Sequence, residues 1–276
     1  MFSSCGIINN EVNFLKINEN STKSFFIEIY CNNRKISTAT GFEIQYKHKY
    51  LITNWHVVSG RNFITKECLD SNCAIPDKLV ITYKKYLPDD KFEWVKNEIK
   101  LLNEEGQKLW YEHPIYGNDI DVVAIPLEKH PTTQHYKEAY SIDSNYELNV
   151  TEPVFVVGFP LGYTVNSKDE PHAIWTSGTV ARDPDLDIMI KNNNFPAFLI
   201  DSKTRQGQSG SPVIYYSESG FDPHYNNGQN IGKAVWGCPF MSEVGIYSGR
   251  INRDSDLGYV WKWKVIKEIL ESIEDN

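Results

Sequence analysis

The 276-residue sequence lacks the features that mark membrane proteins and nucleic-acid-binding proteins. It has no apolar run of about 18 residues, so no transmembrane helix is expected, and no basic amphipathic segment suited to an anionic membrane surface. It has no basic excess either: 28 Lys and Arg stand against 36 Asp and Glu, a net charge of -8, which argues against binding through nucleic-acid phosphates. Low-complexity tracts and internal repeats are also absent. We therefore expect a globular protein whose partners are neither membranes nor nucleic acids.

Cysteine is scarce and unevenly spaced, with Cys5, Cys31, Cys68, Cys73 and Cys238 in the chain. An odd number at irregular spacing favours reduced thiols in a cytoplasmic protein over a disulfide framework. Cys68 and Cys73 lie close in sequence, but no second cysteine pair and no neighbouring histidine completes a zinc site. The N-terminus lacks the basic and apolar regions of a secretory signal peptide. We expect a cytoplasmic protein that needs no metal and no other cofactor.

Short apolar runs bounded by turn residues recur along the chain, for example "KYLITNWHVV", "DVVAIPL" and "EPVFVVGFP". They are rich in Val, Ile, Phe, Tyr and Thr and have the length of strands. Many short strands separated by Gly, Pro, Asn and Asp predict an all-β fold, either an antiparallel barrel or a sandwich. The polar, turn-rich segment 128–150 is typical of a linker between two β halves.

The C-terminal segment has a different period. In "YVWKWKVIKEILESI" apolar residues recur at helical spacing opposite Lys and Glu, which predicts an amphipathic helix packed on the last β-barrel. Its apolar face consists of Val265, Ile266, Ile269, Leu270 and Ile273.

"QGQSGSPV", residues 206–213, places Ser209 in a short stretch rich in turn residues. Since Gly, Ser and Pro are common in turns, the stretch has a plain interpretation as a surface loop. The alternative is a nucleophilic serine held on a tight backbone turn. A serine hydroxyl reacts at neutral pH only when a base lies within hydrogen-bond reach and an acid orients that base. Whether Ser209 is a nucleophile or a surface-loop residue therefore depends on a base and an acid elsewhere in the chain.

His56 and Asp121 are the candidate base and acid. Among the seven histidines, His56 is the one that ends a strand-like apolar run, "YLITNWHVV", although a histidine in that setting is often only a packed residue. "NDIDVVAIPL" offers two acids, Asp119 and Asp121. We prefer Asp121, because it directly precedes the apolar run 122–125, which would hold its carboxylate at the rim of a barrel. Asp119 would lie further toward solvent.

The order His56, Asp121, Ser209, together with "TNWHV", "DVVAI" and "GQSGSPV", resembles the trypsin-like, or chymotrypsin-fold, serine proteases. "VVGFPLGY" and "TSGTVAR" are similar to the opening strands of the second barrel in bacterial members, including HtrA-type proteases. Ser211 after Gly210 is similar to the glutamyl endopeptidase branch. As a whole the chain resembles a bacterial-type cytosolic trypsin-like peptidase.

This resemblance implies a fold of two antiparallel six-stranded β-barrels with a C-terminal α-helix. It divides the chain into an N-terminal extension (1–24), a first barrel with His56 and Asp121 (25–135), a second barrel with Ser209 (136–254) and a C-terminal helix (255–276).

The resemblance also implies the roles of the site residues. Ser209 would attack a peptide carbonyl while His56 takes its proton and later delivers it to the leaving amine. Asp121 would fix the imidazole tautomer and stabilise the imidazolium. The backbone N–H groups of Gly207 and Ser209 would bind the oxyanion, and glycine at 207 makes the required backbone conformation accessible.

"GKAVWG" and "GIYSG" are similar to the two strands that wall the primary specificity pocket in this family. Substrate would add as a strand against Val235, Trp236 and Gly237, although Trp236 has a second interpretation as core filler. The missing side chains of Gly237 and Gly245 would leave the pocket open to a large side chain.

By the same resemblance the base of the pocket lies at Lys203, with Thr204 beside it. A lysine there would favour acidic substrate residues by charge complementarity. The alternative is that Lys203 points to solvent or pairs with an acid such as Glu243. Glutamyl endopeptidases have a histidine where this chain has Val235, which argues against strict glutamate specificity.

These observations predict a serine endopeptidase that acts on proteins or peptides, with narrow specificity and a regulatory role in the cytoplasm. The long charged segment between His56 and Asp121 is typical of loops that contact a regulatory protein partner, and equally of solvent-exposed surface loops that contact none. Two alternatives stay open. One is a trypsin-fold binding or scaffold protein whose site is latent or inactive and is controlled by a partner. The other is an esterase-like hydrolase with the same chemistry.

Overall fold

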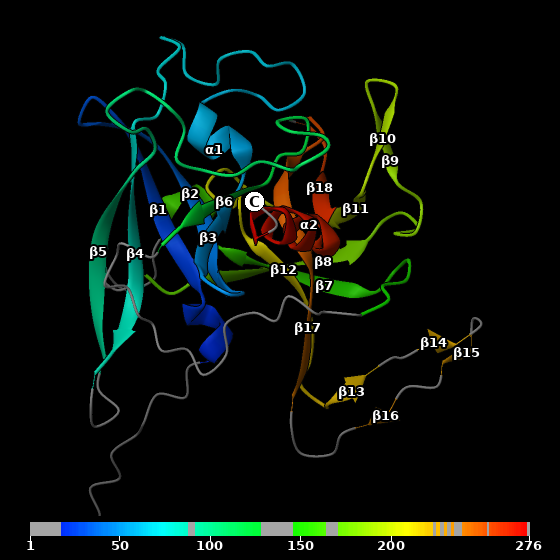
Figure 1. The fold of residues 1–276 in the computed structure, drawn as a ribbon. Coiled ribbons are helices and arrows are strands. Elements are labelled where there is room, and N and C mark those ends of the chain that lie inside the picture. Colours follow the sequence, from blue (N-terminus) through cyan, green and yellow to red (C-terminus); the bar gives the residue numbers. More distant parts are fainter. Residues whose placement is uncertain are drawn as a thin grey trace, which may run out of the picture.

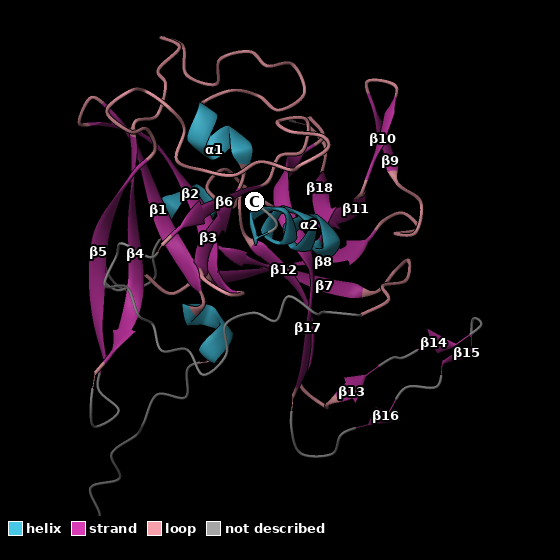
Figure 2. Ribbon diagram, in the orientation of Figure 1, coloured by secondary structure: helices cyan, strands magenta, loops and turns pink. Residues whose placement is uncertain are grey.

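The computed structural model describes residues 18–87, 92–127, 146–163, 171–222, 225–226, 229–230, 233–234, 239–252 and 254–274. Strands dominate this part of the chain and helices are few (Figure 2). The strands form two groups side by side, and the C-terminal helix lies against both (Figure 1). None of the helices in these ranges is long and apolar enough to cross a lipid bilayer.

The first group of strands is one antiparallel sheet. It consists of β1 (Ser24–Cys31), β2 (Arg34–Gln45), β3 (Lys49–Thr53), β4 (Lys78–Tyr86), β5 (Phe92–Lys100) and β6 (Val123–Pro126), in the order β5–β4–β1–β2–β3–β6. The 3₁₀-helix η1 (Glu19–Thr22) precedes β1, and the short helix α1 (Trp55–Ser59) follows β3. Side chains that alternate along β1 enter two different cores. Phe25 and Ile27 pack with Ile81 of β4, while Phe26 on the other face contacts Phe159 of the second group.

The second group of strands is a closed antiparallel barrel with the order β11–β18–β17–β12–β7–β8. Its strands are β7 (Pro153–Gly158), β8 (Ile174–Val180), β11 (Ala197–Ser202), β12 (Pro212–Ser217), β17 (Phe240–Arg250) and β18 (Leu257–Lys262). The one-turn 3₁₀-helix η2 (Pro160–Gly162) follows β7. Alternate residues of these strands fill the barrel interior, among them Val156, Ile200 and Val213.

Three small ladders project from the barrel. One pairs β9 (Ile188–Ile190) with β10 (Asn193–Phe195). The other two lie between β12 and β17, where β13 (Phe221–Asp222) pairs with β16 (Lys233–Ala234) and β14 (Tyr225–Asn226) with β15 (Gln229–Asn230). In Figure 1, β17 extends beyond the barrel toward the ladders β13–β16 and β14–β15.

The C-terminal helix α2 (Trp263–Glu274) joins the two groups. Its predicted apolar face is buried and belongs to the same core as Phe42 of β2 and Trp261 of β18. The helix contacts β6 of the first sheet as well as β17 and β18 of the barrel, and the ring of Trp263 stacks on Phe42 with a centroid distance of 5.7 Å. The two groups therefore share a core that α2 closes.

The predicted all-β fold with a C-terminal helix is confirmed, with two differences in detail. In the first group, the described pairings leave β5 and β6 as sheet edges. The connection between them forms a bridge within itself, Leu102–Lys108, and reaches β6 through the bridge Tyr111–Ala124. At the C-terminus, the segment 255–276 does not begin as a helix, because β18 pairs with both β11 and β17 through Lys262 and α2 begins only at Trp263. Most of the predicted linker, and the predicted boundary at 135, lie outside the described residues.

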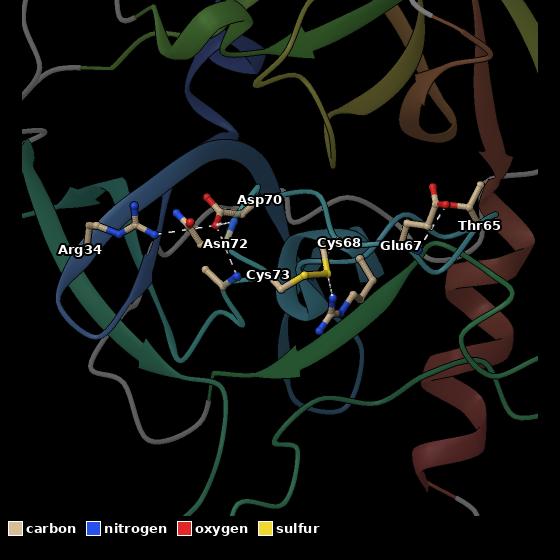
Figure 3. The surroundings of a disulfide bond; sticks show 9 residues. Arg34, Thr65, Glu67, Cys68, Asp70, Asn72 and Cys73 are labelled. Atoms are coloured by element: carbon tan, nitrogen blue, oxygen red, sulfur yellow. Dashed lines mark hydrogen bonds and ion pairs between the residues drawn. A yellow bond between two sulfur atoms is a disulfide. The ribbon is translucent and has the colours of Figure 1, made fainter.

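The prediction of reduced thiols was wrong for one cysteine pair. Cys68 and Cys73 form a disulfide, with their Cα atoms 5.0 Å apart. The turn between them brings them together: the Asp70 carboxylate accepts the backbone N–H of Asn72 at 2.9 Å, and Cys73 has a left-handed backbone with φ of 53°. Figure 3 shows the disulfide beside Asp70, which also faces Arg34. Cys31 is a free cysteine, and Cys5 and Cys238 lie outside the described residues.

Candidate active site

His56 lies on α1, a helix of a single turn. Asn54 before it has an extended backbone, and Gly60 after it adopts the left-handed conformation that ends the helix. A side chain at position 60 would come within 2.8 Å of the Ala74 carbonyl oxygen, so the turn needs glycine. Trp55 and Val57 anchor the helix in the core of the first sheet. His56 is left partly exposed, with its ring free to face a cavity.

Asp121 is fully buried and is held by four hydrogen bonds. Its Oδ2 lies 2.7 Å from Nδ1 of His56, and its Oδ1 accepts the backbone N–H of His56 at 2.8 Å. The hydroxyl of Ser248 also donates to Oδ2, and the side chain of Asn54 donates to the Asp121 carbonyl at 2.7 Å. Three of these bonds reach the carboxylate, so both of its oxygens have hydrogen-bond partners. Because the carboxylate faces Nδ1, the proton of a neutral His56 ring belongs on Nδ1, and Nε2 is left as the acceptor.

Asp119 has a different environment. Its carboxylate is exposed and lies 3.2 Å from the ammonium of Lys66. Of the two acids in "NDIDVVAIPL", the structure therefore brings Asp121 to His56 and leaves Asp119 at the surface.

Ser209 lies on a tight turn at the start of the barrel strand β12. Gly207 and Gly210 on either side of it have φ values of 94° and 83°. A side chain at Gly207 would meet the Phe159 carbonyl oxygen at 2.4 Å, and one at Gly210 would meet the Thr40 carbonyl oxygen at 2.1 Å. Only glycine satisfies both the backbone conformation and the space at these two positions. The Ser209 hydroxyl donates to the backbone carbonyl of Ser248 at 3.1 Å.

Thr40 of β2 fixes this turn from the first sheet. Its backbone N–H donates to the Ser209 carbonyl at 2.8 Å, and its hydroxyl donates to the Gly207 carbonyl at 2.9 Å. Both carbonyl groups are thus held away from the cavity. Among the described residues, the N–H groups of Gly207 and Ser209 have no acceptor, whereas that of Gly210 donates to Tyr247. Two free, neighbouring N–H groups are the arrangement that an oxyanion requires.

A cavity of about 380 Å³ brings His56 and Ser209 to one surface. Its walls come from both strand groups. The first sheet and the disulfide-closed turn contribute mainly apolar side chains, including Phe63, Leu69 and Pro76. The barrel contributes Gly207 and the end of β17, residues 248–250. A cavity with a serine, a histidine and free N–H groups suits acyl transfer.

Gly245 is the only one of the predicted strand and pocket-wall residues that lies in the described part of the chain, since Val235, Trp236 and Gly237 are outside it. Gly245 lies in β17 between Val213 and Lys262, where a side chain would meet the Trp261 carbonyl oxygen at 2.3 Å. The glycine therefore allows the close approach of two strands. Further along the same strand, the Ser248 carbonyl accepts the Ser209 hydroxyl.

Lys203 and Thr204, the predicted pocket base, differ in exposure. Lys203 is exposed, so its ammonium has water around it, and Thr204 is fully buried. The Thr204 hydroxyl shares a hydrogen bond with the phenol of Tyr247. Burial raises the pKa of Tyr247 to about 12, against smaller opposing effects from Thr204 and Arg250, so this phenol is neutral at physiological pH.

Three residues around the site could not be predicted from the sequence: Thr40, Ser248 and Tyr247. Thr40 has the appearance of an ordinary strand threonine in "ATGFEI", and nothing local links it to a turn so far along the chain. Ser248 and Tyr247 lie in "GIYSG", which was recognised as a pocket strand, but its proximity to Asp121 depends on tertiary pairing. Among the described residues, no group of three His, Cys, Asp or Glu side chains is placed to hold a metal ion.

Comparisons with known proteins identify the family and the fold. The family model of the trypsin-like peptidase domain matches residues 39–219, and no curated protein matches the chain significantly. The chain is similar in structure to the thermostable serine protease AL20 from an extremophilic microorganism, with 11% sequence identity, a TM-score of 0.51 and coverage of 94% of this chain and 100% of that one. It is also similar to an inactive form of Rv3671c from M. tuberculosis H37Rv, with 16% identity, a TM-score of 0.50 and coverage of 94% and 89%. At these identities the structural likeness concerns the fold alone.

Proposed function

Because this chain belongs to the trypsin-like peptidase family and is thus a serine endopeptidase, we propose that it hydrolyses peptide bonds with Ser209, His56 and Asp121 as its catalytic triad. The observation that best supports the proposal is the contact of 2.7 Å between Nδ1 of His56 and the buried Asp121 carboxylate. It gives His56 the tautomer that a general base for Ser209 requires.

In this mechanism the Ser209 hydroxyl attacks the peptide carbonyl and passes its proton to Nε2 of His56. Asp121 stabilises the imidazolium, which then protonates the leaving amine as the acyl-enzyme forms. The N–H groups of Gly207 and Ser209 bind the oxyanion, and each such donor contributes about 10²–10³-fold to kcat in comparable enzymes. Water then hydrolyses the acyl-enzyme by the same steps in reverse.

We further propose narrow specificity and a regulatory role inside the cell. The cavity supports selectivity, because its described lining combines an apolar wall with one Lys or Arg side chain, that of the partly buried Arg250. The Cys68–Cys73 disulfide bears on the compartment, since stable disulfides are rare in a reducing cytosol. A cytoplasmic protein with this turn would exist in a reduced and an oxidised form. A regulatory protein partner would be required if the resting site is latent, because the partner would then switch the enzyme on.

A latent site is the second candidate function, and one observation favours it. The Ser209 hydroxyl donates to the Ser248 carbonyl, and among the described residues it makes no hydrogen bond to His56. Transfer of the Ser209 proton to His56 requires the hydroxyl to leave the Ser248 carbonyl, so the active arrangement requires a side-chain movement. A partner that stabilised this rotamer would switch on a latent enzyme.

The proposal is tested by labelling with a fluorophosphonate, which reacts only with an activated serine. We expect an adduct that maps to Ser209 in the full chain and disappears in Ser209→Ala. Ser211→Ala is the matched control, because Ser211 is a buried neighbour whose hydroxyl has no hydrogen-bond partner among the residues that the structure describes, and it should label like the wild type. A folded wild-type protein without an adduct would support the latent form. An adduct accompanied by ester hydrolysis but no peptide cleavage would support an esterase.

A further inference from the structure

The apolar wall of the cavity lies next to His56. The helix that carries His56 ends at Gly60, and the turn that follows packs on this end of the helix, where the backbone N–H of Leu69 donates to the Gly60 carbonyl at 2.9 Å. An added Cβ at Gly60 would also come within 2.9 Å of the Pro76 ring. The wall is therefore held by the same short helix that carries the proposed general base.

This wall has a buried floor and an exposed rim. The floor includes Ile29 of β1, Ala39 of β2 and Val57 of α1, which are 6%, 1% and 1% exposed. Leu69 lines the cavity at the rim, where it is 54% exposed. Ala39 directly precedes Thr40, which fixes the nucleophile turn, so the floor reaches the reacting groups. An apolar side chain bound here would cover Leu69 and be removed from water itself.

The leaving part of the substrate would lie against this wall in the proposed mechanism. When Ser209 attacks, the carbonyl oxygen points to the N–H groups of Gly207 and Ser209, and the leaving nitrogen must come within reach of His56 to receive its proton. The first residue of the leaving peptide is attached to that nitrogen, so its side chain lies on the His56 side of the cavity. The acyl part is then directed to the opposite wall, which the barrel contributes with residues 248–250.

A second hollow continues the cavity along the first sheet. It has a volume of about 400 Å³ and shares residues 36–38 of β2 and Gln206 with the first cavity. Leu161, which is 73% exposed, also lines it. The chain that follows the leaving residue therefore has room to continue along β2.

We propose that the apolar wall is a leaving-group pocket, with Leu69 as a specificity-determining residue, so that the enzyme cleaves before Leu, Ile, Met or Phe. The inference rests on the proposed function and names its substrate class. An apolar side chain gains free energy by leaving water for this wall, whereas a charged or amide side chain would lose its hydration against apolar groups. The charge preference predicted from Lys203 concerns the residue before the cleaved bond, so a cleavage profile separates the two.

Asp70 is the competing determinant, because it is the one acid in the described lining of the cavity. Its Oδ1 accepts the backbone N–H groups of Asn72 at 2.9 Å and Ala74 at 3.4 Å, and lies 3.9 Å from the guanidinium of Arg34 (Figure 3). These contacts direct the carboxylate to its own turn. If Asp70 set the preference, the residue after the cleaved bond would be Lys or Arg.

The experiment is a cleavage profile of the full-length enzyme on a library of peptides, read by mass spectrometry on both sides of each cleaved bond. Fluorophosphonate titration first gives the fraction of active Ser209 in each preparation. For the wild type we expect kcat/KM for bonds before Leu, Ile, Met or Phe to exceed that for matched bonds before Gly, Ser, Asp or Lys by about tenfold or more.

Leu69→Ala should reduce this preference by about three- to tenfold. Leu69→Glu should reduce it further and favour Lys or Arg after the cleaved bond, because it places a carboxylate at the rim. Ile75→Ala and Ile75→Glu are the matched controls. Ile75 lies in the same segment and is 55% exposed, but it is not part of the described cavity lining, so the profile should stay that of the wild type.

A wild-type profile without a preference after the cleaved bond, or with a preference for Lys and Arg there, would overturn the inference while labelled Ser209 leaves the proposed function intact. An apolar preference that Leu69→Glu leaves unchanged, or that Ile75→Glu changes as strongly, would overturn the role of Leu69. A folded wild type that takes no label would count against the proposed function, and the inference would fall with it.

Discussion

At the scale of single residues, the site depends on side chains that never touch substrate. Thr40 is the clearest example, because it is fully buried and its hydroxyl serves two partners. It donates to the Gly207 carbonyl and accepts the Phe159 N–H at 3.2 Å. By holding the Gly207 carbonyl, it sets the plane of the peptide group next to the proposed oxyanion donors. We infer that Thr40 is a positioning residue.

Thr40→Val should therefore lower kcat with little change in KM. We expect a loss of about 10- to 100-fold, less than the 10²–10³-fold effect of removing an oxyanion donor outright. Steady-state kinetics separate the two constants, and Thr40→Ser should restore most of the rate. Thr82→Val is the control, because Thr82 is a buried threonine of the same sheet whose hydroxyl has no hydrogen-bond partner in the described ranges. A rise in KM at unchanged kcat would mean that Thr40 only shapes the binding surface.

The site residues that the sequence predicts are those marked by a pattern in their immediate sequence neighbours. Ser209, His56 and Asp121 stand out because each lies at the end of an apolar run or in a glycine-rich turn, in a recognisable order. The contacts of Thr40 and Ser248 join residues more than a hundred positions apart, so no local pattern contains them. The side chain of Tyr247 is a similar case, since a tyrosine in a strand is equally suited to a core and to a pocket.

At the scale of elements, the disulfide-closed turn 68–73 forms part of the cavity wall, and its order can be changed by reducing the disulfide. Leu69 and Asp70 lie inside the turn and line the cavity, as do Ala74 and Pro76 just beyond it. The turn also has an ion pair to Arg34 at 3.9 Å, visible in Figure 3. In the described part of the chain, no hydrogen bond or ion pair joins the turn to the proposed triad, so the order of the turn should affect substrate binding more than chemistry.

Cys68→Ala/Cys73→Ala should raise KM severalfold and leave kcat nearly unchanged. Loss of the cross-link should also lower the free energy of unfolding by roughly 2 kcal/mol in the chain-entropy model for so short a loop. A dithiol should produce the same KM shift in the wild type, as it breaks the S–S bond to two thiols and is itself oxidised to a disulfide. Cys31→Ala, which removes the free cysteine, is the control. A dithiol effect that persists in the double variant would contradict this role.

The elements could be predicted from the sequence where the signal was local. Apolar runs between turn residues correspond to strands throughout both groups, and "GIYSG" belongs to the barrel strand β17, which pairs with β12 and β18. Pairing between distant strands decided the start of the C-terminal helix: residues 257–262, which the prediction included in the helix, form β18 between β11 and β17.

At the scale of the whole molecule, the proposed site exists only when the two strand groups are docked. His56, Asp121 and Thr40 come from the first sheet, whereas Gly207 and Ser209 come from the barrel. The core between the groups is shared and continuous, from Phe42 to Trp261. The sequence predicted the apolar face of the C-terminal helix but assigned it to the last barrel alone. The contact of α2 with β6 shows that the helix also secures the first sheet.

A substitution on the buried face of α2 should therefore disable the site by separating or unfolding both groups together. Ile269→Ala removes a side chain that is 1% exposed, and should cost about 2–5 kcal/mol of unfolding free energy. Because the core is shared, we expect one cooperative transition in denaturant, in which tryptophan fluorescence and fluorophosphonate labelling of Ser209 are lost together. Glu271→Ala on the exposed face of the same helix should leave both midpoints unchanged. If labelling were lost well before the fluorescence changed, the two groups would be separating while each stayed folded, and α2 would act as a latch between stable halves.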